Sequence, residues 1–197
     1  MIVTCGSASA PIAGQSINGD RVVIAELDDG VVLAVIDGLG HGSDADEAAR
    51  AAANAIQEDP SAPVEQLVER CHARLRGTRG CVMTLARFAA TDQMTWVGVG
   101  NVEAVLVRAP EAPGCDEALA TRGGIIGYRL PRLVSHTLVV ARGDTLALAS
   151  DGIRHGFRIA LTATAEPQEL ADRILSGWST GHDDACVLVA RYLGAAA

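Results

Sequence analysis

Residues 31–42 read Val-Val-Leu-Ala-Val-Ile-Asp-Gly-Leu-Gly-His-Gly. The first six residues are all apolar, which is typical of a strand that is buried on both faces. Asp37 ends this run, and the three nearby glycines predict a tight turn that leaves the core. The stretch therefore predicts a carboxylate presented at the end of a buried strand.

The same combination of a buried strand and an acidic end occurs at two other places. Residues 146–152 read Leu-Ala-Leu-Ala-Ser-Asp-Gly, so Asp151 also ends an apolar run. Asp183 and Asp184 stand directly before a third apolar run, residues 185–190. Carboxylates at the ends of several strands favour a site for a hard cation on a rigid scaffold.

Composition and charge limit the possible classes of protein. The 197 residues have the length of one domain, and we expect a single domain over residues 1–197. An excess of 24 acidic over 16 basic residues gives a net charge of −8, which argues against nucleic acid as a partner. No secretion signal and no apolar run of about 18 residues is found, so we expect a cytoplasmic protein without a membrane partner. Five cysteines without Cys-x-x-Cys spacing argue against a disulfide framework or a zinc site.

Hydrophobic periodicity predicts an α+β layered domain rather than a doubly wound sheet. Helices are expected at 43–56, at 61–77 and around 170–178. Residues 81–107 are expected to form an antiparallel meander of three short strands, and 109–120 an exposed loop. The expected strands are 1–5, 21–27, 31–36, 81–88, 94–100, 102–107, 124–126, 135–140, 145–149 and 185–192.

The acidic strand ends are suited to Mg²⁺ or Mn²⁺, which prefer six oxygen ligands and keep several waters. Two such ions about 3.5–4 Å apart can bind a phosphoryl group and activate a water near neutral pH. A dehalogenase-type phosphatase would need a second Asp two residues after the first, but those positions hold Leu39 and Ile153. None of the acidic windows has the spacing of an EF-hand loop. The carboxylates together with a backbone carbonyl are suited to a two-ion site.

Three acidic motifs resemble the signature motifs of metal-dependent (PPM/PP2C-type) serine/threonine phosphatases, SpoIIE subgroup. They are Asp37-Gly38-Leu39-Gly40-His41-Gly42, Ser150-Asp151-Gly152-Ile153 and Asp183-Asp184-Ala185-Cys186-Val187. An upstream Asn18-Gly19-Asp20 matches the acidic position that the family places before the first motif. The stretches Glu69-Arg70-Cys71-His72, Arg79-Gly80, Val99-Gly100-Asn101-Val102 and Gly143-Asp144 are similar, in order and spacing, to the RsbX-type stressosome phosphatases. The resemblance covers nearly the whole chain.

The resemblance implies a PP2C-like four-layer sandwich, in which two stacked antiparallel sheets are flanked by helices. It implies that Asp37, Asp151 and Asp183 are the catalytic residues, and that Asp37 bridges two ions. The carbonyl of Gly38 would bind one ion, and Asp20 would act mainly through a metal-bound water. The implied metal ligands are Asp20, Asp37, Gly38, Asp151 and Asp183. Asp184 stands where relatives often carry Asn, so its expected role is to orient a neighbour.

The implied activity is hydrolysis of phosphoserine or phosphothreonine by a metal-bridged hydroxide, with two Mn²⁺ or Mg²⁺ ions as cofactors. The implied partners are phosphorylated STAS-domain scaffold proteins of the stressosome, and we expect the enzyme to be a monomer. One alternative is a catalytically silent module that binds phosphoprotein. A second alternative is a phosphatase that acts on another anti-anti-sigma-type partner.

Several positions near the motifs have a simpler interpretation. Asn101 is expected to be a turn former, and His41 a loop residue or hydrogen-bond donor rather than a metal ligand. Ser150 could help to orient a neighbouring carboxylate, but a hydroxyl at a strand end is the simpler interpretation. His155 and His182 are expected at the surface. Many eukaryotic relatives carry a phosphate-binding Arg before the first acidic position, whereas residues 1–19 contain no Arg or Lys. The ions would therefore hold most of the phosphate, and a net charge of −8 disfavours a uniformly acidic partner unless local patches compensate.

Overall fold

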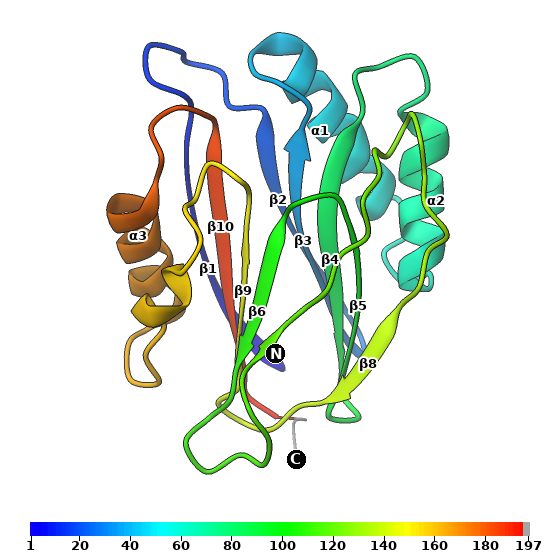
Figure 1. Cartoon of the computed structure of the whole chain (residues 1–197). Coiled ribbons are helices and arrows are strands. Elements are labelled where there is room, and N and C mark those ends of the chain that lie inside the picture. Colours follow the sequence, from blue (N-terminus) through cyan, green and yellow to red (C-terminus); the bar gives the residue numbers. More distant parts are fainter. Residues whose placement is uncertain (195–197) are drawn as a thin grey trace.

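Two five-stranded antiparallel sheets lie face to face between helices in the computed structural model, which describes residues 1–194 (Figure 1). Sheet A has the order β1-β10-β9-β6-β7, and sheet B has the order β2-β3-β4-β5-β8. The predicted α+β sandwich is therefore confirmed. The strands are β1 Val3–Ala10, β2 Asp20–Leu27, β3 Gly30–Gly38, β4 Cys81–Ala89, β5 Gln93–Val99, β6 Glu103–Val107, β7 Glu117–Ala118, β8 His136–Val139, β9 Thr145–Ala149 and β10 Ala185–Tyr192.

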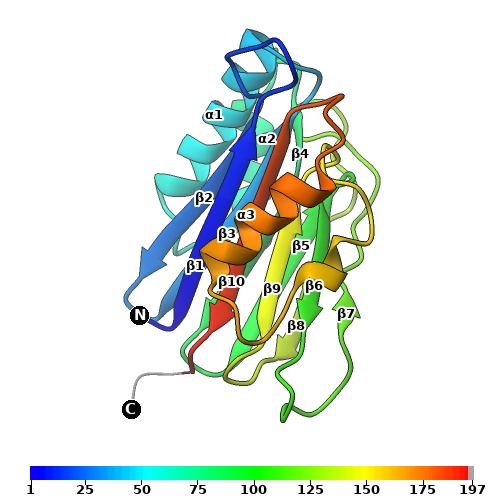
Figure 2. The same ribbon diagram turned by 90° about the vertical axis from the view of Figure 1, so that its left-hand side faces the viewer.

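Three α-helices cover the outer faces of the sheets. Helices α1 (Ser43–Gln57) and α2 (Val64–Arg74) pack on sheet B. Helix α3 (Pro167–Trp178) packs on β1 and β10 of sheet A and follows a short 3-10 helix, Phe157–Ala160 (Figure 2). Within residues 1–194, no helix is long and apolar enough to cross a membrane.

Strand β3 has a buried side chain on both of its faces because it lies between two cores. Val31, Leu33 and Val35 belong to the core between the two sheets. The intervening residues of the strand, Val32, Ala34 and Ile36, belong to the core between sheet B and its helices. Alternation along a strand then places Asp37 on the face that looks toward the other sheet.

The predicted meander over 81–107 is wrong in its last strand. β4 and β5 form a hairpin in sheet B, but β6 crosses to sheet A and pairs with β9. Gly100 adopts φ 94° between β5 and β6, a conformation in which the chain can turn from one sheet to the other. Residues 124–126 form isolated bridges instead of a strand, and β7 lies inside the predicted loop 109–120. Short strands cannot be assigned to one of two sheets from local sequence, because both sheets bury the same residue types.

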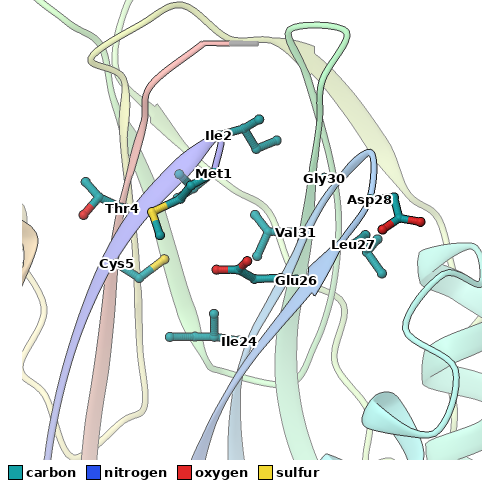
Figure 3. A pocket seen from close by; sticks show the side chains of 11 residues that line it. Met1, Ile2, Thr4, Cys5, Ile24, Glu26, Leu27, Asp28, Gly30 and Val31 are labelled. Atoms are coloured by element: carbon teal, nitrogen blue, oxygen red, sulfur yellow. The ribbon is translucent and has the colours of Figure 1, made fainter. Parts of the chain in front are cut away.

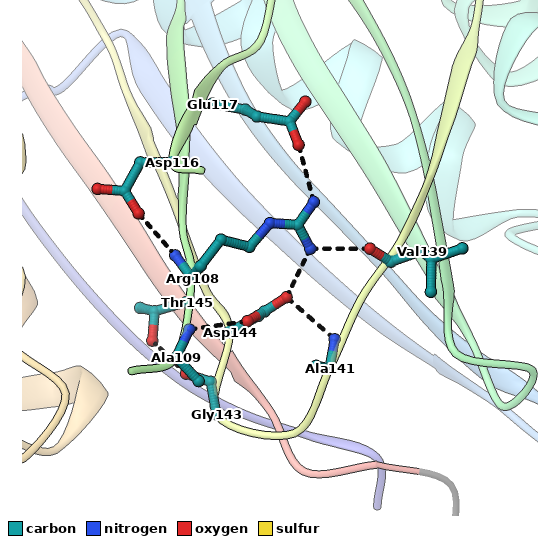
Figure 4. Close-up of polar contacts among 9 residues, drawn as sticks. All are labelled: Arg108, Ala109, Asp116, Glu117, Val139, Ala141, Gly143, Asp144 and Thr145. Atoms are coloured by element: carbon teal, nitrogen blue, oxygen red, sulfur yellow. Dashed lines mark hydrogen bonds and ion pairs between the residues drawn. The ribbon is translucent and has the colours of Figure 1, made fainter. Parts of the chain in front are cut away.

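A buried ion pair holds together the end of the sandwich where β6 ends and β9 begins (Figure 4). Asp144 is fully buried and accepts hydrogen bonds from Arg108 Nη1, Ala109 N and Ala141 N at 2.8, 2.8 and 3.0 Å. Arg108 also donates to Glu117 at 2.7 Å, and its own backbone N–H donates to Asp116 at 2.9 Å. These bonds fix the loops on either side of β6 and β9 at this end.

Candidate metal centre

The acidic residues predicted from sequence meet at the opposite end of the sandwich, where the gap between the two sheets opens. The start of β2 and the end of β3 bring Asp20 and Asp37 there, and the register pairs these two residues directly. Sheet A contributes Asp151 after β9 and Asp183 before β10. Figure 1 shows these strand ends together at the upper end of the molecule. Four strands from two sheets thus carry four carboxylates to one place.

Burial and mutual repulsion raise the pKa of the two paired carboxyl groups. For Asp37 the largest cause is burial, followed by the negative charges of Asp20, Asp151 and Asp183. The Asp151 carboxyl group is also a hydrogen-bond partner that favours the protonated form of Asp37. For Asp20 burial again raises the pKa most, and the hydrogen bond from Ser150 opposes that shift. Carboxylates that repel one another in a buried setting are strongly stabilised by a cation.

Ser150 fixes the orientation of the buried Asp20 side chain. Its hydroxyl donates to Asp20 Oδ2 at 2.6 Å, and it accepts the backbone N–H of Cys186 at 2.9 Å. Ser150 directly precedes Asp151 and follows the alternation of β9, so its side chain faces the other sheet. The contact favours the alternative in which Ser150 orients a nearby carboxylate over the simpler interpretation of a strand-end hydroxyl.

Asn101 holds one oxygen of Asp151. Its Nδ2 donates to Asp151 Oδ2 at 2.8 Å and so restrains the carboxylate of this predicted ligand. The antiparallel pairing of β6 with β9 explains the contact, because Glu103 lies opposite Ala149. Asn101 precedes Glu103 by two residues and Asp151 follows Ala149 by two residues, so they lie at the same end of the strand pair. Asn101 is therefore more than a turn former, and no local signal predicted the contact, because the sequence did not reveal that β6 pairs with β9.

Asp184 binds backbone rather than facing the open end. Its Oδ1 accepts the N–H of Ile12 at 2.8 Å, and its Oδ2 accepts the N–H of Gly19 at 2.7 Å. These two bonds tie the segment before β2 to the start of β10 and so position Asp20. The backbone N–H of Asp184 donates to Asp183 Oδ1 at 2.8 Å. The geometry matches the expectation that Asp184 orients its neighbours.

Gly38 lies where no side chain fits. A Cβ at this position would stand 2.2 Å from the carbonyl oxygen of Ala45 and 2.9 Å from that of Gly19. The Gly38 N–H donates to the Gly19 carbonyl at 3.2 Å, so the turns after β3 and before β2 are bonded together. Close packing of these backbones brings the loop 38–42 against the start of α1.

The donor set fits hard divalent ions that keep part of their water shell. Every predicted side-chain ligand is a carboxylate, which is the ligand type that Mg²⁺ and Mn²⁺ prefer. Within residues 1–194, no three Asp, Glu, His or Cys side chains are placed so that they could hold one metal ion together. Catalytic sites for such ions keep coordination positions open for water and substrate.

The histidines near the motifs point to other partners. His41 Nδ1 is hydrogen-bonded to Gln15 Nε2 at 2.8 Å, and His155 Nδ1 is hydrogen-bonded to Glu103 at 2.6 Å. The His155 side chain is 94% exposed, and His182 is also exposed. Both positions agree with the expected surface location.

A cleft of about 260 Å³ lies at the other end of the β2–β3 hairpin, between that hairpin and β1 (Figure 3). It is lined by residues such as Cys5, Ile24, Glu26 and Val31. Burial raises the pKa of the Cys5 thiol to about 11, so its reactive thiolate is scarce near neutral pH. Leu27 pairs with Gly30 here, whereas Asp20 pairs with Asp37 at the opposite end of the hairpin. The cleft is separate from the acidic site.

Known proteins with this fold include several phosphatases. The phosphoserine phosphatase RsbX of Bacillus subtilis (strain 168) is 28% identical over 142 residues, 71% of this chain and 69% of RsbX. A structure described under "The bacterial stressosome: a modular system that has been adapted to control secondary messenger signaling" has a TM-score of 0.89 at 27% identity, covering 97% of this chain and 100% of that one. RsbX in complex with magnesium has a TM-score of 0.86 at 24% identity, covering 97% and 96%.

A fourth likeness is to the catalytic domain of the serine/threonine protein phosphatase PstP in complex with two manganese ions. Its TM-score is 0.77 at 18% identity, and the match covers 98% of this chain and 99% of that one. This level of identity shows a shared fold. In addition, residues 27–193 match the family described as Stage II sporulation protein E (SpoIIE). The chain therefore belongs to the SpoIIE family of PP2C-type phosphatases.

Proposed function

We propose that this chain is a metal-dependent phosphatase that hydrolyses phosphoserine or phosphothreonine on a folded protein. The observation that carries the proposal is the direct pairing of Asp20 with Asp37 at the open end of the sandwich, with Asp151 beside them. We further propose that residues 1–197 act as a single catalytic domain, as a monomer in the cytoplasm. The relationship to a phosphoserine phosphatase supports the substrate class.

Each acidic residue has a part in holding the ions and orienting the substrate. Asp37 would bridge the ions, with the Gly38 carbonyl, Asp151 and Asp183 completing the protein ligands and Asp20 acting through water. Two Mn²⁺ or Mg²⁺ ions at this set would neutralise the phosphoryl oxygens and make hydroxide available near neutral pH. Ser150 and Asn101 keep their carboxylates in place without reorganisation during the reaction.

The bond changes follow from hydrolysis itself. An oxygen from water bonds to phosphorus, the bond from phosphorus to the seryl oxygen breaks, and that oxygen leaves with a proton. No side chain becomes phosphorylated. Cys71, Cys81 and Cys186 are unsuited to a covalent route, because burial raises the pKa of these thiols well above neutral pH.

The partners that we propose are phosphorylated STAS-domain scaffold proteins of the stressosome. The likeness to a stressosome-associated structure and to RsbX supports this choice. A phosphatase for another anti-anti-sigma-type partner would use the same site with a different docking surface. A silent phosphoprotein-binding module would be expected to lack acidic ligands, whereas all the predicted ones are present in this chain.

The decisive experiment measures phosphate release and Mn²⁺ binding together. The wild-type protein should release phosphate from a phosphorylated STAS protein only with Mn²⁺ or Mg²⁺, and a chelator should abolish release. Asp37→Ala and Asp183→Ala should each lower kcat/KM by several orders of magnitude and weaken Mn²⁺ binding measured by calorimetry. Asp184→Asn should be mild by comparison, because asparagine keeps one of the two acceptor oxygens and loses the bond to only one backbone N–H group.

Asp172→Ala, which removes an exposed carboxylate on α3, is the control and should change neither quantity. A greater loss in Asp184→Asn than in Asp183→Ala would reverse the ligand assignment at this motif. Trapping of a covalent phosphoenzyme during turnover would contradict the mechanism.

A further inference from the structure

One stretch of this acidic protein, residues 118–143, contains basic residues but no acidic residue. Between Glu117 and Asp144 the sequence contains four arginines and no Asp or Glu, although the net charge of the chain is −8. The arginines are Arg122, Arg129, Arg132 and Arg142, and all four are exposed. Charges of one sign that gather locally can attract a partner that the whole molecule would repel.

The first part of this stretch lies against the end of the molecule that holds the acidic site. The Arg122 carbonyl accepts the N–H of Gly100 at 2.8 Å, and the Arg122 N–H donates to the Gly98 carbonyl at 3.0 Å. Asn101, which holds Asp151, is the next residue after Gly100. Arg122 is therefore attached to the same turn that supports the proposed metal ligand.

The next part forms a compact turn that is seated on β4 and α2. Ile126 exchanges backbone hydrogen bonds with Cys81 at 2.9 and 3.0 Å, and the Gly127 N–H donates to His72 Nδ1 at 3.0 Å. Arg129 closes the turn, because its N–H donates to the Ile125 carbonyl at 2.8 Å and its carbonyl accepts the Ile125 N–H at 2.9 Å. Figure 1 shows this segment passing beside α2 on its way to β8. The turn is thus fixed in place while it presents side chains outward.

Tyr128 stands at the tip of this turn and is 81% exposed, whereas the other tyrosine, Tyr192, is fully buried. An exposed tyrosine between arginines has the composition of a binding hot spot, in which Tyr and Arg are enriched. Among the described residues, the side chains of Arg122 and Arg129 form no ion pair with a carboxylate. Their charges are available to a partner.

Arg79 extends the positive surface to the glycine loop after Asp37. The Nη1 atom of Arg79 lies 2.9 Å from the position that a Cβ on Gly40 would occupy. It pairs with Asp44 at 2.9 Å, and both side chains are exposed, so the pair can exchange partners at little cost. Arg79, Arg122, Tyr128 and Arg129 together form what is called here the arginine rim.

We propose that the arginine rim docks an acidic surface next to the phosphorylated residue of the protein substrate. This inference rests on the proposed function and names the surface that supplies its selectivity. Arginine suits the task because its planar guanidinium binds carboxylate or phosphate through two parallel hydrogen bonds. The rim compensates for the absence of Arg and Lys in residues 1–19, because the docking energy positions the phosphate for attack.

The test compares two substrates, p-nitrophenyl phosphate and an intact phosphorylated STAS protein. The quantity compared is the ratio of kcat/KM for the phosphoprotein to kcat/KM for p-nitrophenyl phosphate. Arg122→Glu and Arg129→Glu should each lower this ratio at least tenfold, mainly by raising the KM for the phosphoprotein. Tyr128→Ala should lower the ratio less. Arg142→Glu is the matched control, because it reverses an exposed charge of the same stretch beside Asp144 at the far end of the sandwich. It should leave the ratio at the wild-type value.

The salt dependence gives a second readout. The wild-type KM for the phosphoprotein should rise with ionic strength, and Arg129→Glu should show a weaker rise. An unchanged ratio in Arg122→Glu and Arg129→Glu, or an equal change in Arg142→Glu, would overturn the docking assignment.

A binding experiment separates this inference from the proposed function. If the wild-type protein releases phosphate from neither substrate, the proposed function is wrong. Docking is then decided by calorimetric titration of the phosphorylated STAS protein in the presence of chelator. The Arg129→Glu variant should bind the phosphorylated STAS protein at least tenfold more weakly than the wild type does. Equal affinities would overturn the proposal that the arginine rim docks the substrate, independently of the proposed function.

Discussion

At the scale of single residues, this protein places buried carboxylates where their charges oppose one another. Asp20 and Asp37 are brought together by strand register, and Ser150 locks one of them with a bond of 2.6 Å. Repulsion of this kind lowers the stability of the metal-free protein and favours ion binding. At the proposed metal site, the repulsion would therefore lower the stability of the metal-free protein and raise its affinity for metal ions.

The raised pKa of both carboxyl groups predicts how the metal-free protein responds to pH. Above the ordinary carboxyl pKa of about 4, the folded protein holds protons on Asp20 and Asp37 that the unfolded chain has released. Their contribution to stability is therefore fully present at low pH and is lost as the pH rises through the raised values. With chelator present, the melting temperature should fall between about pH 5 and about pH 8 by several degrees.

Asp37→Asn is the matched variant for this prediction, because it keeps the shape of the side chain and removes its charge. It should flatten the pH dependence and raise the melting temperature of the metal-free protein near pH 8. Added Mn²⁺ should raise the wild-type melting temperature and have little effect on the variant. A wild-type melting temperature that rises with pH in chelator would contradict the assignment of raised pKa values.

At the scale of secondary-structure elements, the two ends of the sandwich have separate tasks. One end holds the acidic site, and the other is closed by Arg108 and Asp144, which join β6 to β9. The Arg108 side chain is 11% exposed and that of Asp144 is fully buried. Removal of Asp144 alone should strongly destabilise the protein, because the largely buried Arg108 then keeps only Glu117 as a charged partner.

Asp144→Ala should lower the free energy of unfolding by about 3–5 kcal/mol, as measured by urea denaturation. It leaves Arg108 without its buried partner and removes the acceptor of two backbone N–H groups. Arg74→Ala breaks an exposed pair with Glu58 and should cost at most about 1 kcal/mol. The activity of folded Asp144→Ala protein below its unfolding transition should remain close to that of the wild type, since the pair is distant from the acidic site. Equal losses of stability in the two variants would refute the distinction between the buried and the exposed pair.

At the scale of the whole molecule, a small phosphatase domain with a net charge of −8 must bring an anionic group to an acidic site. The metal ions supply local positive charge, but residues 1–19 have no Arg or Lys to assist them. We therefore expect contacts with a folded partner outside the site to position the phosphate.

An intact phosphorylated STAS protein should therefore be the better substrate than a short peptide with the same phosphosite. We expect at least a tenfold higher kcat/KM, equal to about 1.4 kcal/mol of transition-state stabilisation. Steady-state kinetics on both substrates at one Mn²⁺ concentration makes the comparison, and p-nitrophenyl phosphate serves as the common reference. Equal constants would leave a broad phosphatase that recognises phosphate through the metals alone.

The sequence by itself determined the acidic residues and the strands that carry them. An apolar run that ends in Asp-Gly is a local signal, because burial on both faces and the need for a turn are read from neighbouring residues. The strand ends at Asp37 and Asp151 were predicted in this way, and Asp183 was predicted from its place directly before an apolar run. The family motifs added their proposed roles, which stay predictions until the ligand variants are measured.

Only the tertiary structure decided which sheet each strand joins and which neutral residues support the site. β6 leaves the predicted meander for the other sheet, and that crossing is what brings Asn101 to Asp151. Likewise, Ser150 reaches Asp20 across the gap between the sheets, and Arg122 is attached to the turn before Asn101. These contacts join residues far apart in the chain, so they depend on sheet pairing and on the packing of two sheets, which local patterns of hydrophobicity do not specify.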